Sequence, residues 1–174
     1  VNAGGGFLGI GDAARAQLDS SWFTGLIGTR PAGAIPVSHP VAKVTASGEN
    51  PPNEISSKLT DGDANTKWLV RTPTGWVTYE LAAPARITGY ALTSANDFDG
   101  RDPRDWTLQG SADGQAWTDL DRRTNQTFPE RFQIRRFGVS TPGDYKFYRL
   151  NITANSGEPL TQLADLRLFT GSTE

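Results

Sequence analysis

Cysteine and methionine are both absent from the 174 residues of this chain. The lack of cysteine excludes a disulfide framework, a thiolate metal site and a cysteine nucleophile. Methionine is missing even at position 1, which indicates a processed or excised fragment. Stability must therefore come from an apolar core, with room for a hard cation as an added cross-link.

The chain also lacks a strong excess of charge. Lysine and arginine number 17 and aspartate and glutamate 19, so the formal net charge is −2. The charges are mixed along the sequence and form no basic stripe that could release counterions from phosphates, so nucleic acid is a poor partner. No apolar run reaches about 18 residues, and the basic-then-apolar order of a signal peptide is missing. We expect a soluble monomer without a transmembrane segment, whose export signal is already gone.

One domain is the expected organisation, because this length suits a single core and 36% of the residues are hydrophobic. Residues 1–40 differ from the rest: they are rich in Gly, Pro and Ala and contain a short helical stretch over 12–18, for which Asp12 is a plausible N-cap. We interpret 1–40 as an N-terminal extension or linker, 41–170 as the domain and 171–174 as a C-terminal tail.

From residue 41 onward, short runs rich in Val, Ile, Thr and aromatic residues alternate with clusters of Gly, Pro, Asn and Asp. This spacing is typical of an all-β sandwich or barrel. The runs predict strands at Val41–Ser47, Trp76–Leu81, Arg86–Thr93, Asp105–Ser111, Trp117–Asp121, Arg131–Val139, Phe147–Thr153 and Leu163–Thr170.

Alternation with a period of two predicts which side chains enter the core. One face is shared by Val77, Tyr79 and Leu81, a second by Tyr148, Leu150 and Ile152, and a third by Trp106 and Leu108. The stretch Ser111-Ala112-Asp113-Gly114 contains an Asp-Gly pair, which supplies the positive φ of a tight turn and predicts a hairpin there. The long polar segments 48–54, 69–75, 94–104 and 155–161 remain as loops, where function is usually located.

Several stretches follow one another in an order that resembles a known family. They are LTDGD at 59–63 with Thr66 and Trp68, GWVTYEL at 75–81, WTLQGS at 106–111 with Asp113-Gly114 and Trp117, FYRL at 147–150, and LADLRL at 163–168. Residues 41–170 thereby resemble the coagulation factor V/VIII type C, or discoidin, superfamily and, within it, carbohydrate-binding module family 32. The resemblance implies a discoidin-like jelly-roll β-sandwich of the galactose-binding-domain-like class.

The same resemblance implies a setting for the domain. The stretches 93–97 and 101–106 look like those of modules attached to bacterial α-mannosidases of glycoside hydrolase family 92. We therefore expect a non-catalytic carbohydrate-binding module in a secreted, extracellular bacterial enzyme, covalently linked to a catalytic domain. Its ligands would be glycan termini of mannose or galactose type. Galactose-binding members commonly place a histidine in the site, whereas His39 precedes the first predicted strand.

Two interpretations are open for the acidic turn near residue 61. Asp61 and Asp63 flank a glycine, and Asn65 and Thr66 add oxygen donors, as a calcium ion with its six to eight oxygen ligands requires. The turn could equally be solvated and hold no ion. The resemblance implies a structural Ca²⁺ site made by Lys58 and Ala164 through their carbonyls, Asp61, Asp63, Thr66, and Asp165 in place of the family's usual glutamate.

A sugar site needs an aromatic face for the apolar C–H patch and planar polar side chains for vicinal hydroxyls. The resemblance places ligand contacts on the loops at one end of the sandwich. The candidates there are Glu49, Asn50, Arg71, Asn96, Asp97, Phe98 and Asn155. Phe98 would be the stacking platform, or would simply plug its loop, while Arg71 and Asn155 would grip adjacent hydroxyls. The tryptophans 68, 76, 106 and 117 match structural elements of the family, so we interpret them as packing residues.

Other functions fit the sequence less well. Loop carboxylates such as Glu49, Asp97 and Glu158 could flank a glycosidic bond, but scattered acids are common and the resemblance implies no catalysis. An adhesion or lipid-binding module would need more exposed apolar residues on its loops. A structural spacer or protein-docking domain of a multidomain enzyme stays open as the alternative.

Overall fold

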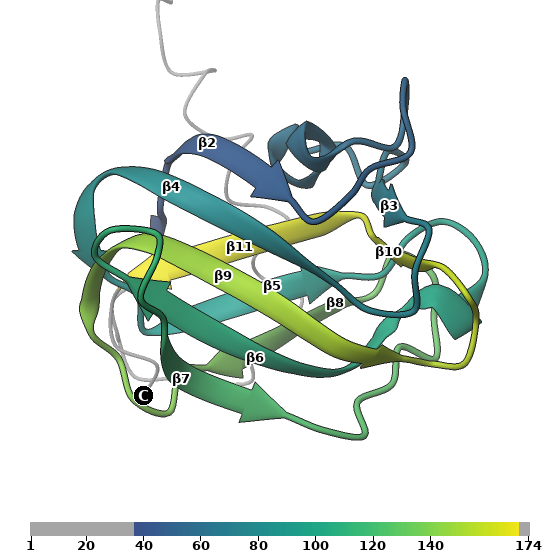
Figure 1. Ribbon diagram of the computed structural model, residues 1–174. Helices are drawn as coiled ribbons and strands as arrows, with labels where there is room; N and C mark the ends of the chain where they lie inside the picture. The colour runs from purple at the N-terminus through teal and green to yellow at the C-terminus, as the bar shows by residue number, and fades with distance from the viewer. Residues whose placement is uncertain (1–36, 171–174) are drawn as a thin grey trace, which may run out of the picture. The chain divides into compact units, whose positions relative to one another are not determined.

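Two antiparallel sheets form the body of the molecule, and a short pair of strands lies at one end (Figure 1). The structure is a computed structural model that describes residues 37–170. One sheet contains the strands β1 (Val37–Ser38), β11 (Asp165–Thr170), β5 (Gly89–Thr93) and β8 (Ile134–Gly138) in that order. The other contains β2 (Val41–Ala46), β4 (Gly75–Arg86), β9 (Asp144–Asn155), β6 (Pro103–Ser111) and β7 (Thr118–Arg123). The short pair is β10 (Thr161–Leu163) with β3 (Trp68–Val70).

The predicted all-β class is confirmed, and every predicted strand has a counterpart. Some boundaries differ. β4 continues past Leu81 to Arg86, with a register shift against β9 between Glu80 and Ala85. The last predicted strand is interrupted at Ala164, so β10 and β11 join different sheets. β1, β3 and β10 have only two or three residues each, too few for a periodic pattern to reveal.

The core lies between the two large sheets and contains the side chains that the alternation predicted. Val77, Leu108 and Leu150 of the five-stranded sheet have no exposed surface, and neither have Tyr90 and Leu92 of the four-stranded sheet. Their alternation with outward-facing neighbours explains why these segments form strands with one buried face. Burying this apolar area drives the association of the sheets.

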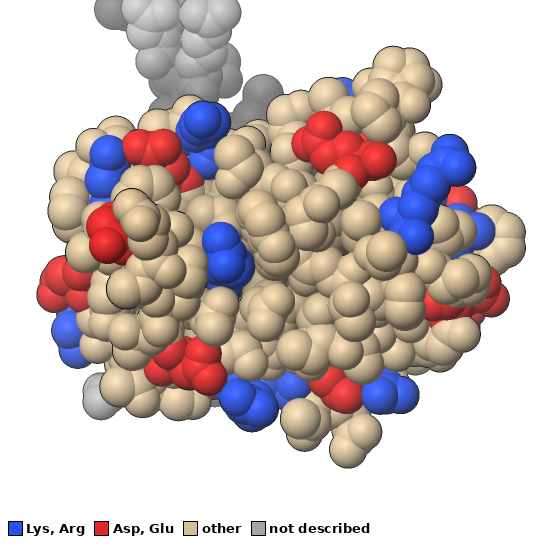
Figure 2. All heavy atoms as spheres, viewed as in Figure 1, with Lys and Arg blue, Asp and Glu red and all other residues tan. Residues whose placement is uncertain are grey.

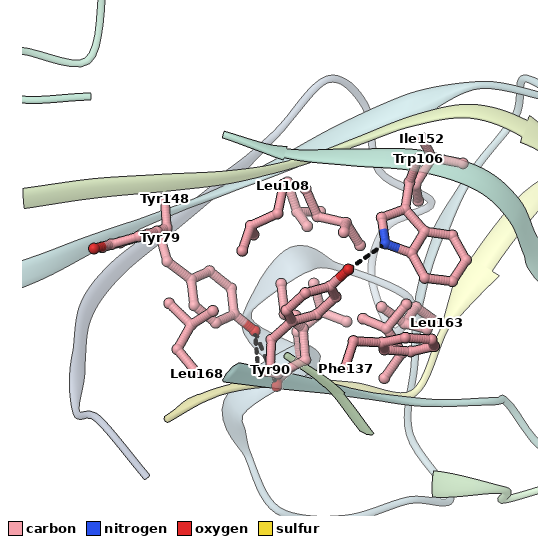
Figure 3. Packing of buried hydrophobic residues seen from close by; sticks show 14 of the residues in the cluster. Tyr79, Tyr90, Trp106, Leu108, Phe137, Tyr148, Ile152, Leu163 and Leu168 are labelled. Atoms are coloured by element: carbon pink, nitrogen blue, oxygen red, sulfur yellow. Dashed lines mark hydrogen bonds between the residues drawn. The ribbon is translucent and has the colours of Figure 1, made fainter. Parts of the chain in front are cut away.

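Three buried polar contacts fix the alignment of the core, and Figure 3 shows Trp106, Tyr90 and Tyr79, which make them. The Trp106 indole Nε1 donates to the Tyr90 hydroxyl at 2.8 Å, and that hydroxyl donates to Asp121 Oδ2 at 2.7 Å. The Tyr79 hydroxyl donates to the carbonyl of Leu166 at 2.8 Å. Because an unpaired buried hydroxyl or indole N–H costs free energy, these bonds favour one relative position of the sheets.

The predicted hairpin is also confirmed. β6 and β7 pair antiparallel, and Gly114 in the connecting turn has a φ of 76°. The Asp113 carboxylate accepts the amide N–H groups of Gln115 and Ala116 at 2.8 and 3.0 Å. The turn is therefore held by its own side chain, as its sequence indicates.

Residues 37–40, which the sequence analysis placed in the extension, pair with the sandwich: Val37 and Ser38 lie opposite Thr170 and Phe169, and the His39 amide donates to the Leu168 carbonyl. The predicted helix near 12–18 and the tail 171–174 lie outside the described residues. Between residues 37 and 170 there is no helix with the length and apolar character needed to cross a bilayer.

The strand registers bring the predicted loops to one end of the sandwich. β4 begins at Gly75, which lies opposite Ile152 near the end of β9, and β6 begins at Pro103 opposite Asn155. Asp165, which begins β11, lies opposite Thr93, which ends β5. The loops that leave these strand ends therefore share one end of the molecule, which we call the loop end.

Candidate functional site

A surface hollow of about 710 Å³ opens at the loop end. It is bounded by Ser47–Glu49, by the connection from β3 to β4, and by Asn151–Thr153 of β9. Gly48 lets the backbone come close to β3, because a Cβ added there would lie 2.9 Å from Val70 Cγ2. Its volume is in the range of small-molecule sites, and it includes parts of the loops 48–54 and 69–75, where the sequence predicted ligand contacts.

Arg71 and Glu49 are the charged side chains that line this hollow, and both are exposed. Arg71 Nε and Nη2 donate to Asn50 Oδ1 at 3.1 and 2.7 Å. Glu49 Oε1 accepts the Ser56 amide at 2.8 Å, at the start of the 3₁₀ helix η1 (Ser56–Thr60). The structure thus brings together three of the predicted contact residues, each held by a hydrogen bond.

A chain of polar contacts connects this group to the neighbouring loop. Asn50 Nδ2 donates to the Glu54 carboxylate, and the two residues also form an isolated backbone bridge. The buried ammonium of Lys67 lies 3.6 Å from Glu54 Oε1 and 2.5 Å from Asp97 Oδ1. Burial acts to raise the pKa of Asp97, but the hydrogen bond and the charge of Lys67, together with Gln162 and Arg101, leave that pKa below its ordinary value. Lys67, which the sequence analysis did not select, is therefore the link between the loops.

Phe98 lies on this second loop and is 59% exposed, as a stacking platform requires. Its φ is 33°, an unusual conformation for a residue with a side chain. The Arg101 guanidinium lies 3.9 Å from the Phe98 ring centroid, and Gln162 Nε2 donates to the Phe98 carbonyl at 3.2 Å. Asn96 is exposed nearby in sequence. Phe98 does not line the hollow that contains Arg71.

A buried ion pair between Asp102 and Arg131, which we call the clamp, holds the loop that carries Phe98. Asp102 is 1% exposed and binds the Arg131 guanidinium through both carboxylate oxygens. Arg131 also donates to the carbonyls of Ala95, Asp97 and Phe128 at 3.4, 3.0 and 2.9 Å. Burial raises the pKa of Asp102 to about 6, against the lowering effect of Arg131. Asp102 therefore has a structural role in this loop.

Asn155 has a different position from the one predicted for a sugar contact. It is 5% exposed, and its Nδ2 donates to the carbonyls of Glu158 and Leu160 at 2.7 Å each. Its Oδ1 accepts the Gly157 amide at 3.0 Å. The amide therefore shapes the loop 156–160 from within and has no free group to offer a hydroxyl, so we do not retain it as a contact residue.

The tryptophans divide into two groups. Trp68 and Trp106 are core residues, as predicted, with 0% and 1% exposure. Trp76 and Trp117 are partly exposed, and Trp76 lines the hollow beside Arg71. The sequence did contain the signal for this, because inward-facing Val77 requires that Trp76 point outward. The aromatic side chain of the hollow is thus Trp76, not Phe98.

The predicted calcium residues lie around the end of η1 and the start of β11. Asp61 Oδ2 accepts the Thr66 hydroxyl at 2.7 Å and lies 3.2 Å from Lys58 Nζ, and Asp61 Oδ1 accepts the Asp63 amide. Asp63 Oδ1 accepts both N–H groups of Asn65 at 2.9 Å, so this carboxylate closes its own turn.

On β11, Asp165 is buried and bound to Arg167 at 2.9 Å, and Ala164 is buried beside it in the sequence. Burial raises the pKa of Asp165, and the negative charge of Asp61 contributes to the rise. A hard-cation site here would use the carboxylates of Asp61 and Asp165. The described residues contain no group of three or more acidic, His or Cys side chains that could hold a metal, so backbone and hydroxyl oxygens would have to complete the shell.

The fold and the hollow define a small β-sandwich module with a loop-lined surface site at one end. This chain belongs to the F5/8 type C domain family, whose family model matches residues 43–166. The predicted resemblance to the discoidin superfamily is thereby confirmed.

Solved structures share the fold at low sequence identity. The module CpGH89CBM32-5 from Clostridium perfringens, in complex with GalNAc-β-1,3-galactose, superposes with a TM-score of 0.64 at 19% identity, over 74% of this chain and 94% of that one. The family 32 module of C. perfringens NanJ, in complex with galactose, gives 0.65 at 15% identity, over 78% and 100%. A chitosan-binding module of a Paenibacillus chitosanase/glucanase gives 0.62 at 19% identity, over 74% and 94%.

A sequence relative at higher identity comes from a plant. It is the peptide-N(4)-(N-acetyl-β-glucosaminyl)asparagine amidase of Arabidopsis thaliana, 36% identical over 137 residues, which are 72% of this chain. The match covers 19% of that relative, so the chain corresponds to about a fifth of its length. The bacterial source, the secretion and the link to family 92 α-mannosidases remain predictions.

Proposed function

We propose that this domain is a non-catalytic carbohydrate-binding module, with the hollow at the loop end as its ligand site. The observation that carries the proposal is the convergence of a partly exposed indole, Trp76, with Arg71 and Glu49 around one shallow hollow. The indole would pack on the C–H face of a sugar ring, while the guanidinium and carboxylate would bind vicinal hydroxyls. The family match and the carbohydrate-binding neighbours support this proposal.

The polar chain from Asn50 to Asp97 supplies preorganisation. Arg71 is held against Asn50, and Lys67 ties the Glu54 loop to Asp97, so ligand binding would order few side chains. Phe98 would contact a larger ligand at the margin of the site. A shallow hollow of this kind predicts weak binding, near 1 mM or about −4 kcal/mol, which attachment to an enzyme would make useful by raising the effective concentration.

A structural calcium ion is part of the proposal. Asp61, Asp165 and the Thr66 hydroxyl would bind it with carbonyls of Lys58, Thr66 and Ala164, and Asp63 would act by shaping the turn. The ion would bind the carboxylates of Asp61 and Asp165 and so fasten the end of η1 to β11.

The parent protein would be an enzyme that acts on glycans or glycoproteins, to which this module brings the substrate. The predicted glycoside hydrolase and the amidase activity of the Arabidopsis relative are two versions of this idea. A protein-docking role is the second candidate, and one observation favours it. Phe98, Phe132 and Ile134 are the large hydrophobic side chains exposed within residues 37–170, and they lie on segments joined by the Arg131–Asp102 pair.

The test is a glycan array in calcium, followed by titration of any bound glycan. Arg71→Ala should weaken binding about tenfold or more, because a charge-assisted hydrogen bond is lost. Arg86→Ala is the matched control. Arg86 is exposed and ends β4, whose first residues border the hollow, so this substitution at the far end of the strand should leave affinity unchanged. Phe98→Ala tests whether the loop that contains Phe98 contributes to glycan affinity. Absence of binding to any glycan by the folded domain would reject the proposal and favour protein docking.

A further inference from the structure

Arg149 lies between two tryptophans on the outer face of the five-stranded sheet. The carbon centre of its guanidinium is 4.4 Å from the Trp76 ring and 3.9 Å from the Trp117 ring. Trp76 is on β4, Arg149 on β9, and Trp117 directly precedes β7, so the stack crosses the sheet. Alternation with buried Val77 and Leu150 places the side chains of Trp76 and Arg149 on the solvent side.

The charge of Arg149 is not neutralised within residues 37–170. Its Nε donates to Thr78 Oγ1 at 3.0 Å, and no acidic side chain of the described segment forms an ion pair with it. By contrast, Arg86, Arg123 and Arg131 each pair with an aspartate. The nearest acid along β4, Glu80, is engaged by Lys146 at 2.9 Å. Arg149 therefore presents the terminal edge of its guanidinium without a carboxylate partner.

The Arg149 guanidinium, which has no carboxylate partner, is also partly buried. The indoles and the strand surface remove water from the guanidinium, and this desolvation lowers the pKa of Arg149. A desolvated cation with unused N–H donors gains more from an incoming anion than a fully hydrated one does. Contact with two rings also restricts the motion of the guanidinium, so that fewer of its conformations are lost when an anion binds.

The stack continues directly from the hollow. Trp76 and Asn151 lie opposite each other in the β4–β9 register, and both line the hollow. Arg149 is two residues farther along β9, about 7 Å in an extended strand. Figure 2 shows this face, on which uncharged side chains cover most of the surface and acidic groups gather toward the margin. A ligand that leaves the hollow across Trp76 therefore meets Arg149 next.

We propose that the Trp76–Arg149–Trp117 stack is a second subsite, which binds the carboxylate of an acidic sugar in a glycan whose adjoining residue occupies the hollow. This inference rests on the proposed function and specifies its ligand as a chain that contains a uronic acid. The guanidinium would receive the carboxylate through its terminal nitrogens, and Trp117 would contact the sugar ring. A single neutral sugar would use the hollow alone.

The experiment compares trimers of galacturonic acid and of glucuronic acid with their carboxyl-reduced neutral counterparts. The wild-type domain should bind at least one acidic trimer about fivefold or more tighter than its neutral counterpart at low salt, and high salt should reduce this preference. Arg149→Gln should remove the preference, so that the acidic and the neutral trimer bind this variant with equal affinity. Arg86→Gln, which removes an exposed and paired arginine from the same sheet, should retain it.

A measurement on the wild-type protein keeps the test independent of variant folding. The indole N–H resonance of Trp117 should shift with the acidic trimer and not with the neutral one. Equal affinity for the acidic and neutral trimers, or a preference that survives in Arg149→Gln, would overturn the second subsite while neutral-glycan binding left the proposed function standing. Absence of binding to every glycan would overturn both.

Discussion

The loop from Ser94 to Asp102 and the turn from Asp61 to Thr66 both contain acidic side chains. The partners of these side chains differ: they are distant in the sequence for the loop and local for the turn. Asp102 is buried and depends on Arg131, which is 29 residues away in the sequence. Asp61 is exposed, and its hydrogen-bond partners Lys58, Asp63 and Thr66 all lie within five residues. The first loop is therefore part of the tertiary structure, whereas the second is a local turn that an ion could reinforce.

Breaking the clamp of the first loop should have the largest effect. Arg131→Gln leaves the buried Asp102 carboxylate without its charged partner and also removes donors to three loop carbonyls. We expect a loss of about 3–5 kcal/mol in the free energy of unfolding, measured by urea denaturation. Arg122→Gln, at an exposed arginine, should change it by about 0.5 kcal/mol or less. A loss below about 1 kcal/mol for Arg131→Gln would show that the clamp does not support the fold.

The pH dependence of stability should differ between the two acids. Asp102 has a pKa of about 6 in the folded state against an ordinary 3.8, so folding takes up a proton between these values. Its contribution is fully present below about pH 4 and is lost as the pH rises through about 6. The stability of the wild type minus that of Asp102→Asn should therefore fall across this window, by about 3 kcal/mol at most.

The contribution of Asp61 to stability should change with pH in the opposite direction. Burial acts to raise its pKa, but hydrogen bonds from Asp63, Thr66 and Lys58 lower it below 3.8. Its contribution is present above the ordinary pKa and is lost as the pH falls through the lowered value. A wild-type curve that ran parallel to Asp102→Asn from pH 4 to 6 would contradict the assignment of the raised pKa to Asp102.

Calcium should stabilise the protein through the turn from Asp61 to Thr66 and not through the loop from Ser94 to Asp102. At a free concentration one hundred times the dissociation constant, the ion should add about 2.7 kcal/mol, seen as a higher Tm in calcium than in chelator. Asp61→Asn and Asp165→Asn should abolish this increase, because each removes a carboxylate from the proposed site. Asp102→Asn should preserve it. An identical Tm with calcium and with chelator would reject the cation site.

The smallest effect is expected for the exposed pair beside that site. Lys58→Ala removes an ion pair of 3.2 Å to Asp61 and should cost less than about 1 kcal/mol. Because Lys58 would bind calcium through its carbonyl, the calcium-dependent rise in Tm should remain in this variant. Its loss would indicate that the side chain of Lys58 organises the turn.

Sequence reasoning anticipated most of the fold, because alternation records which face of each strand is buried. Val77, Tyr79, Leu150 and Ile152 are all in the predicted core. The short strands β1, β3 and β10 could not be recognised from alternation, because two or three residues show no period. In the candidate site, Glu49 and Arg71 lie on the hollow as the loop assignment predicted, but Asn155 turns inward to its own loop.

The β class, the buried faces and the hairpin turn could be predicted from the amino-acid sequence, because they depend on side-chain alternation and on local backbone preferences. Tertiary structure alone decided which polar residues meet. Lys67 reaches Asp97 across 30 positions, Arg131 reaches Asp102, and Arg149 stands between Trp76 and Trp117. The physical reason is that contacts between charged or aromatic side chains act over a few ångströms in space, and only the packing of the sheets brings distant positions within that range.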